Sequence, residues 1–174
     1  MRRIIVILLA CIAVVAAQSP TPARPDAVQI TQLFGPGFHP VPGFPVLTAD
    51  LDGDGAEDAV AVATAEDPML DQDAFHYKVI DPYSARFGIG DPRITSQFST
   101  HGEKPRLVLV VHNWRAPKAK FVILNLSFEK LSISRTRLKK KTVPAILAEE
   151  VGGFRSLVFW DGKKWKWEDG GISD

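Results

Sequence analysis

TADLDGDGAEDAVAVAT, residues 48–64, places four aspartates within nine positions and then runs into an apolar segment. Carboxylates this close repel one another unless a cation or hydrogen bonds compensate their charge. Gly53 and Gly55 stand among them and allow the chain to curl sharply, because glycine readily adopts positive φ. The apolar residues on both sides predict two strands. We therefore expect a β-hairpin whose connecting loop is a candidate ion site.

Asp50, Asp52 and Asp54 alternate along the loop, and Asp58 stands at its ninth position. Calcium takes six to eight oxygen ligands and tolerates irregular geometry, whereas magnesium tends to keep its waters. We expect these four carboxylates to bind calcium, with a backbone carbonyl near Ala56 completing the shell. The alternative is a metal-free turn in which the aspartates accept hydrogen bonds from the local backbone. We expect a bound ion to brace the hairpin rather than to perform catalysis.

The pattern D-x-D-G-D-G-x-x-D between two strands resembles the FG-GAP and VCBS-type repeat family. Phe34-Gly35-Pro36-Gly37-Phe38 and Gly43-Phe44-Pro45 are similar to the lead-in of such repeats, so the resemblance covers residues 34–64. It implies calcium ligation by the same four aspartates and by the carbonyl of Ala56. An EF-hand does not fit, because its twelfth position is occupied by Ala61. A seven-bladed propeller is also excluded, since the chain holds one copy of the motif.

Strand-like segments dominate the rest of the chain. Alternating or continuous apolar patterns predict strands over residues 27–34, 44–49, 58–64, 75–80, 106–111, 120–126, 131–138, 155–160 and 164–167. The runs 106–111 and 120–126 are almost entirely apolar, so both of their faces should be covered. Asp161-Gly162 predicts a hairpin, residues 127–130 suggest another, and residues 66–74 offer a short helical turn. The expected fold is mostly β: a single antiparallel β domain over residues 27–174, as a sandwich, a curled sheet or a partial propeller.

The N-terminal residues have the layout of a targeting segment. Residues 1–17 combine two arginines, an apolar run and small residues, which predicts a secretory signal peptide. Residues 18–26 then form a proline-rich leader. Cys11 lies in a lipobox-like context, so a lipoprotein anchored through Cys11 is the alternative to plain cleavage. The protein is expected to be secreted or periplasmic and not transmembrane after cleavage.

Acidic and basic residues are separated along the chain. Residues 45–81 hold ten acidic residues and one lysine, and residues 104–141 hold eleven basic residues and one glutamate. We favour complementary pairing of these segments within the fold. The alternative is a basic surface at residues 135–141, RTRLKKK, that meets an anionic polymer or a membrane. Secretion argues against nucleic acid as a partner.

No catalytic motif stands out. The four histidines lack the spacing of a zinc helix, and no nucleophile-elbow sequence is present. Trp165 and Trp167 share one face of the last predicted strand and serve either as core residues or as a platform for a sugar ring or peptide. We expect a binding or interaction module whose ligand is a protein, a glycan or an anionic polymer. The alternative is an extracellular or envelope-associated hydrolase with a structural calcium.

Overall fold

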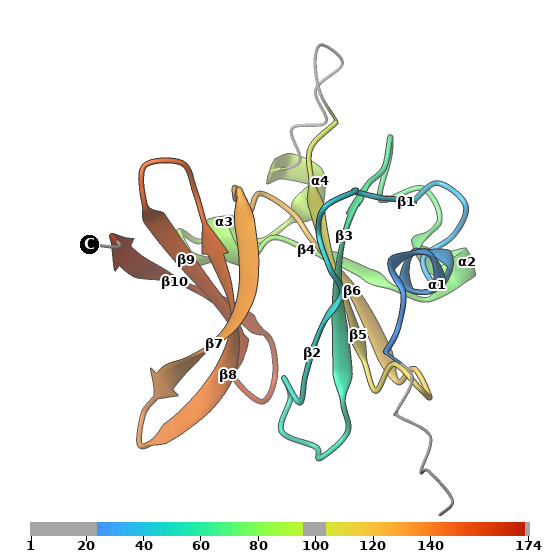
Figure 1. The fold of residues 1–174 in the computed structure, drawn as a ribbon. Helices are drawn as coiled ribbons and strands as arrows, with labels where there is room; N and C mark the ends of the chain where they lie inside the picture. The colour runs from blue at the N-terminus through green and yellow to red at the C-terminus, as the bar shows by residue number, and fades with distance from the viewer. Residues whose placement is uncertain (1–23, 96–103, 173–174) are drawn as a thin grey trace, which may run out of the picture.

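The computed structural model describes residues 24–95 and 104–172. It is mostly β, with 42% strand and 13% helix, and its strands form two sheets without a closed barrel (Figure 1). The prediction of a mostly β fold is confirmed. The signal peptide, most of the proline-rich leader and Cys11 lie outside the described residues.

The first sheet contains six strands in the order β1-β3-β5-β6-β4, with β2 pairing β3 beside β1. Their bounds are β1 (His39–Pro40), β2 (Leu47–Ala49), β3 (Asp58–Thr64), β4 (Lys78–Ile80), β5 (Leu107–His112) and β6 (Ala119–Ile123). All pairings in this sheet are antiparallel except that of β4 with β6, which is parallel. The expected antiparallel domain therefore needs one correction: its β4 edge is parallel.

The second sheet is a meander in the order β10-β9-β8-β7. Its strands are β7 (Lys130–Leu138), β8 (Lys141–Glu149), β9 (Phe154–Trp160) and β10 (Trp165–Ile172). The turn around Asp161-Gly162 joins β9 to β10, with Trp160 opposite Trp165. The hairpin predicted there is confirmed.

Strands β3 and β5 are buried on both faces. One face, with Val60, Val108 and Val110, shares an apolar core with Ile146 and Val158 of the second sheet. The opposite face packs against Ile30 of the first helix and against the aromatic residues Phe34, Phe38 and Tyr77. In Figure 1 the two sheets accordingly form adjacent layers, and α1 (Ala27–Gln32) and α2 (Gln72–Phe75) lie on the outer side of the first sheet. This arrangement explains why the β5 and β6 sequences are almost continuously apolar.

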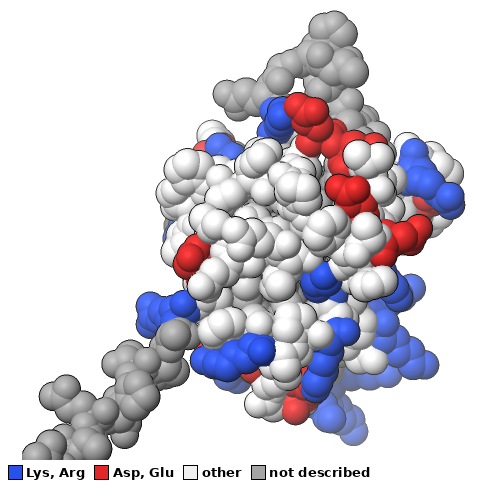
Figure 2. Space-filling model, turned by 90° about the vertical axis from the view of Figure 1, so that its right-hand side faces the viewer, with Lys and Arg blue, Asp and Glu red and all other residues white. Residues whose placement is uncertain are grey.

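The space-filling view from the side of α1 and α2 shows a largely uncharged centre (Figure 2). Acidic atoms gather mainly toward its upper right, and basic atoms line mainly its lower part. Acidic and basic side chains are thus largely separated on this face.

The strand predicted at residues 27–34 is wrong, because α1 occupies most of this segment. Asp26 begins the helix with a capping box: its carboxylate accepts the N–H of Val28 at 2.6 Å, and the Gln29 side chain accepts the N–H of Asp26 at 3.4 Å. Ile30 and Thr31 of the helix are buried, and so is Phe34 in the turn that follows it. The alternation of apolar and polar residues over 27–34 was therefore not a reliable sign of a strand.

Two further predictions are corrected by the sheet topology. Residues 127–130 do not form a hairpin, because they cross from β6 in the first sheet to β7 in the second. Strand β8 was not predicted, since Pro144 interrupts its pattern. Pro144 pairs with Arg135 of β7, while β9 pairs with β8 only from Ile146 onward. A proline is tolerated there because the other edge of β8 is still unpaired.

The predicted strand at residues 75–80 is shorter in the structure, because Phe75 ends α2 and His76 follows with φ 52°. The other two helices, α3 (Pro82–Arg86) and α4 (Pro92–Thr95), were not predicted. Among the described residues, no helix has the length and apolarity needed to cross a membrane.

Candidate metal centre

The aspartate-rich loop joins two antiparallel strands. Strand β2 ends at Ala49 and β3 begins at Asp58, and these two residues are paired across the hairpin. Gly53 and Gly55 have φ of 77° and 87°, a region that other residues rarely adopt. The sharp curl that the sequence predicts at these glycines is confirmed.

Backbone N–H groups hold the aspartate side chains of the loop. The Asp50 carboxylate accepts the N–H of Gly53 at 2.8 Å and that of Gly55 at 3.0 Å. Asp52 and Asp54 each accept the N–H of the residue two positions further on, at 3.1 and 2.8 Å. These bonds are the ones expected for a metal-free turn, and they also orient the carboxylates in advance.

Three of the predicted ligands converge. Asp50, Asp52 and Asp54 each offer a carboxylate oxygen, and these oxygens lie within 4.8 Å of one another. Such a set of hard oxygen donors suits a cation such as calcium. Ala56 lies in the same turn and donates its N–H to Asp54. The use of its carbonyl as a ligand stays a prediction.

Asp58 lies in a second group, which shares Asp52 with the first. Its side chain is buried, and the carboxylate accepts the N–H of Leu51 at 2.7 Å and that of Asn113 at 2.8 Å. Burial raises the pKa of the Asp58 carboxyl, although the two N–H donors favour its charged form. Asp58 thus already has a structural role in tying the loop to the end of β5.

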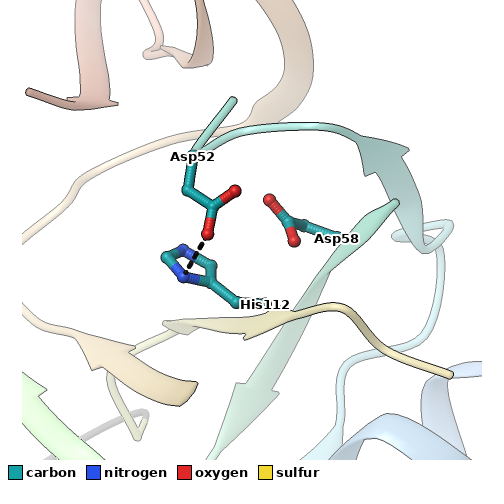
Figure 3. Close-up of side chains that lie close together, drawn as sticks. All are labelled: Asp52, Asp58 and His112. Carbon is teal, nitrogen blue, oxygen red and sulfur yellow. Dashed lines mark ion pairs between the residues drawn. The ribbon is translucent and has the colours of Figure 1, made fainter. Parts of the chain in front are cut away.

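His112 completes this second group. Figure 3 shows Asp52, Asp58 and His112 gathered at one point, with Nδ1 of His112 at 3.2 Å from Oδ2 of Asp52. Ligand atoms of the three residues lie within 4.8 Å of one another. His112 is 4% exposed, and its Nε2 has no hydrogen-bond partner in the described part of the chain. A set with one nitrogen and two carboxylates suits a transition-metal ion better than calcium.

Sequence reasoning missed His112. The residue comes next to Asp58 because Ala59 pairs with Val111 in the β3–β5 ladder. No local sequence pattern indicates which distant strand pairs with β3. The proximity of His112 to Asp58 could therefore be inferred only once that pairing was known.

The loop also rests on the turn between β5 and β6. The carbonyl of Glu57 accepts the backbone N–H of Trp114 at 3.2 Å, and its carboxylate accepts the Trp114 indole N–H at 3.0 Å. This indole hydrogen bond lowers the pKa of Glu57. Lys118 lies 2.5 Å from Oδ2 of Asp54, and its ammonium lowers the pKa of that carboxyl. One lysine thus partly compensates the charge of the loop.

Ion pairs support the complementary pairing of the acidic and basic segments. Three salt bridges join them: Glu66–Lys104 at 2.8 Å, Glu57–Arg115 at 3.0 Å and Asp54–Lys118 at 2.5 Å. Residues 135–141 lie at the far end of the β7–β8 hairpin, and their basic side chains are exposed. A role of this basic stretch in binding a polymer or membrane stays a prediction.

The tryptophans on the last strand take different places. Trp165 is 4% exposed and belongs to the core between the sheets. Trp167 is partly buried and packs edge-on against Tyr83, with ring centroids 5.0 Å apart. Of the two roles left open by the sequence, the core role fits Trp165.

Comparisons with protein-family models, with curated proteins and with solved structures found no match. The resemblance of residues 34–64 to the FG-GAP and VCBS-type repeats therefore remains a prediction from the motif itself.

Proposed function

We propose that this chain is a secreted or periplasmic binding module whose β2–β3 loop is stabilised by calcium. The observation that carries the proposal is the convergence of oxygens from Asp50, Asp52 and Asp54 within 4.8 Å. Lys118 is the one lysine or arginine paired with these three carboxylates in the described part of the chain. A divalent ion would compensate the remaining charge and would be matched by hard oxygen donors.

The ion would act on the structure. The loop contacts the β5–β6 turn through Glu57, through Asp58 and through the pairing of Asp54 with Lys118 of the turn. An ordered loop would therefore also fix the end of the first sheet. Calcium binding to the folded state alone stabilises it by mass action, by about 2.7 kcal/mol at a hundredfold excess over Kd. For a chain of this size, that corresponds to a rise in Tm of roughly 5–10 °C.

The test is thermal unfolding of the purified protein with calcium, with magnesium and with a chelator, followed by calcium titration calorimetry. We expect calcium to raise Tm, and the double variant Asp50→Asn/Asp54→Asn to lose this rise while unfolding near the wild-type temperature in chelator. Asp73→Asn, an exposed change on α2, is the matched control. Equal Tm of the wild type in calcium and in chelator would overturn the calcium proposal.

An extracellular or envelope-associated hydrolase is the second candidate. The contact between Asp52 and His112 favours it, because a carboxylate on Nδ1 orients an imidazole whose Nε2 can take up a proton. However, His112 is 4% exposed and packs against Phe121, Trp160 and Trp165, with ring centroids 5.2 to 5.7 Å away. Substrate would have to displace these rings. Hydrolysis of a panel of ester and glycoside substrates that is lost in His112→Gln would support this candidate over the binding module.

A further inference from the structure

A cavity of about 280 Å³ lies where the two sheets meet beside α3. Its walls come from β4 and β6 of the first sheet, from α3, and from the β9–β10 hairpin of the second sheet. The residues around it are Lys78, Ile80, Asp81, Pro82, Ala85, Gly90, Phe121, Trp160, Lys163, Lys164 and Trp165. None of these residues belongs to the aspartate loop.

Aromatic rings form one wall of the cavity. Phe121, Trp160 and Trp165 pack with ring centroids 5.7 to 6.0 Å apart and in tilted or edge-on orientations. His112 contacts all three rings from the side of the aspartate loop. Ile80, Pro82 and Ala85 extend the apolar surface. A wall of this kind is suited to stacking a flat, apolar ring.

Three lysines stand around the same cavity. Lys78, Lys163 and Lys164 are exposed, and none forms a salt bridge with a carboxylate in residues 24–95 and 104–172. The turn that carries two of them is fixed by Asp161, whose carboxylate accepts the backbone N–H groups of Lys163 and Lys164, both at 2.9 Å. These hydrogen bonds use the backbone and leave both ammonium groups outside any salt bridge in the described residues, although the charge of Lys164 also acts on the Asp161 carboxylate and helps to lower its pKa.

Of the described residues that line the cavity, Asp81 is the one with a carboxylate, and this carboxylate already accepts hydrogen bonds. Asp81 accepts the backbone N–H of Ser84 at 2.9 Å and an amide N–H of Asn125 at 2.6 Å. It caps α3 and is 2% exposed, so it does not offset the lysines at the surface. Counting Asp81 and the neighbouring Asp161 against Lys78, Lys163 and Lys164, the formal charge of the described residues around the mouth is net positive.

A smaller adjoining cavity of about 190 Å³ is also lined by basic side chains. It shares Pro82, Ala85, Lys164 and Trp165 with the first cavity and is also lined by Arg86, Lys166 and Trp167. Arg86, Lys166 and the indole ring of Trp167 thus lie along the same groove between α3 and β10, with Lys166 at 4.0 Å from the Asp161 carboxylate.

The residue types discriminate between ligands. Among the described residues, the lining of the 280 Å³ cavity includes no Asn, Gln, Ser, Thr or Tyr, so it offers few neutral hydrogen-bonding side chains for the hydroxyl groups of a neutral sugar. An anionic group suits the lysines, and a planar ring suits the aromatic wall. The volume lies just below the roughly 300–1,000 Å³ of drug-sized sites, which favours a ligand of one or two rings.

We propose that this cavity binds a small aromatic carboxylate, with its ring against Trp160 and Trp165 and its carboxylate among Lys78, Lys163 and Lys164. The inference deepens the proposed binding role by giving it a ligand class. It rests on residues outside the aspartate loop, so the calcium experiment does not decide it.

The test uses 2-naphthoate as the probe in titration calorimetry, with 2-naphthamide and cyclohexanecarboxylate as matched compounds that lack the charge or the aromatic ring. We expect the naphthoate to bind at least tenfold more tightly than either compound, and its affinity to fall as salt is added. Lys163→Gln/Lys164→Gln should weaken binding at least tenfold. Lys139→Gln/Lys140→Gln, the same charge change at the β7–β8 turn, should leave it unchanged.

Further measurements separate a loss of ligand binding from a loss of folding and locate the bound probe. The Tm of each variant establishes that it is folded, and Lys78→Gln tests the opposite side of the cavity without altering the β9–β10 turn. The indole N–H signals of Trp160 and Trp165 should shift in NMR spectra on addition of the naphthoate. Equal binding of naphthoate and naphthamide, or no binding of naphthoate, would overturn the proposal. So would an unchanged naphthoate affinity in both Lys163→Gln/Lys164→Gln and Lys78→Gln, or tighter binding of a neutral methyl glycoside than of naphthoate.

Discussion

Asp58 at the start of β3 accepts the backbone N–H of Asn113, just beyond β5, at 2.8 Å. The same buried carboxylate accepts the N–H of Leu51 in the loop. Asp58→Asn keeps the shape but offers one acceptor oxygen for two buried donors. We expect it to lower the free energy of unfolding by about 1–3 kcal/mol in urea denaturation. Asp73→Asn, whose side chain is exposed, should change it by less than about 0.5 kcal/mol. Similar losses in both variants would contradict the bridging role of Asp58.

Lys118 would compete with a calcium ion bound in the loop as proposed above. Its ammonium lies 2.5 Å from Oδ2 of Asp54, so calcium must displace it or bind beside a like charge. Lys118→Met should therefore raise calcium affinity several-fold in titration calorimetry. Lys104→Met frees the carboxylate of Glu66 outside the loop and should not alter it. Unchanged or weaker calcium binding by Lys118→Met would rule out this competition.

The Asp81 carboxyl should make stability depend on acid pH. Burial alone would raise its pKa, but hydrogen bonds from Ser84, Thr95 and Asn125 outweigh burial and hold the pKa below its usual value. A pKa lowered in the folded state means stabilisation that is present above the unfolded pKa of about 3.9 and lost as pH falls through the folded pKa.

We therefore expect urea unfolding free energies of the wild type to decrease between about pH 5 and about pH 2, and less so in Asp81→Asn. Asp91→Asn is the control. Its pKa is also lowered, by Arg93, but the pair is exposed and contributes little to stability. The contribution of Asp81 would be refuted by parallel pH profiles for the wild type and Asp81→Asn.

Ile146 links the second sheet to the first through the shared core, and it is 0% exposed. Ile146→Ala removes buried methyl and methylene groups and leaves a cavity. We expect a loss of about 2–4 kcal/mol in the free energy of unfolding, measured by urea denaturation. Val151→Ala truncates an apolar side chain that is 79% exposed and should be nearly neutral. A loss below about 1 kcal/mol in Ile146→Ala would mean that the sheets do not depend on this contact.

Local patterns were sufficient to predict much of the β structure. The β3 bounds, the covered faces of β5 and β6 and the Asp161-Gly162 turn follow from apolar runs and turn residues, and the structure agrees. The helix α1 was mistaken for a strand because an amphipathic segment of eight residues satisfies both periodicities. Strand β8 was missed because the position of Pro144 on an unpaired edge depends on tertiary structure.

Some residues of the candidate site could be predicted from the sequence, and others depend on tertiary structure. Asp50, Asp52 and Asp54 are close in sequence, so their convergence could be predicted from the loop itself. The neighbours that decide its electrostatics, His112 and Lys118, come from β5 and the turn after it. Their place beside the loop depends on the pairing of β3 with β5, which no short-range pattern specifies.

That pairing also has a consequence for how the chain folds. The second sheet joins each strand to its neighbour in sequence, so its ladders close through short turns. Strand β3 must instead find β5 across the intervening residues 65–106, which costs more loop-closure entropy. Non-local pairings of this kind slow folding. We expect refolding to be limited by the meeting of β3 and β5, with the meander able to assemble earlier and the contacts of the aspartate loop with His112 and Asn113 formed only when β5 arrives.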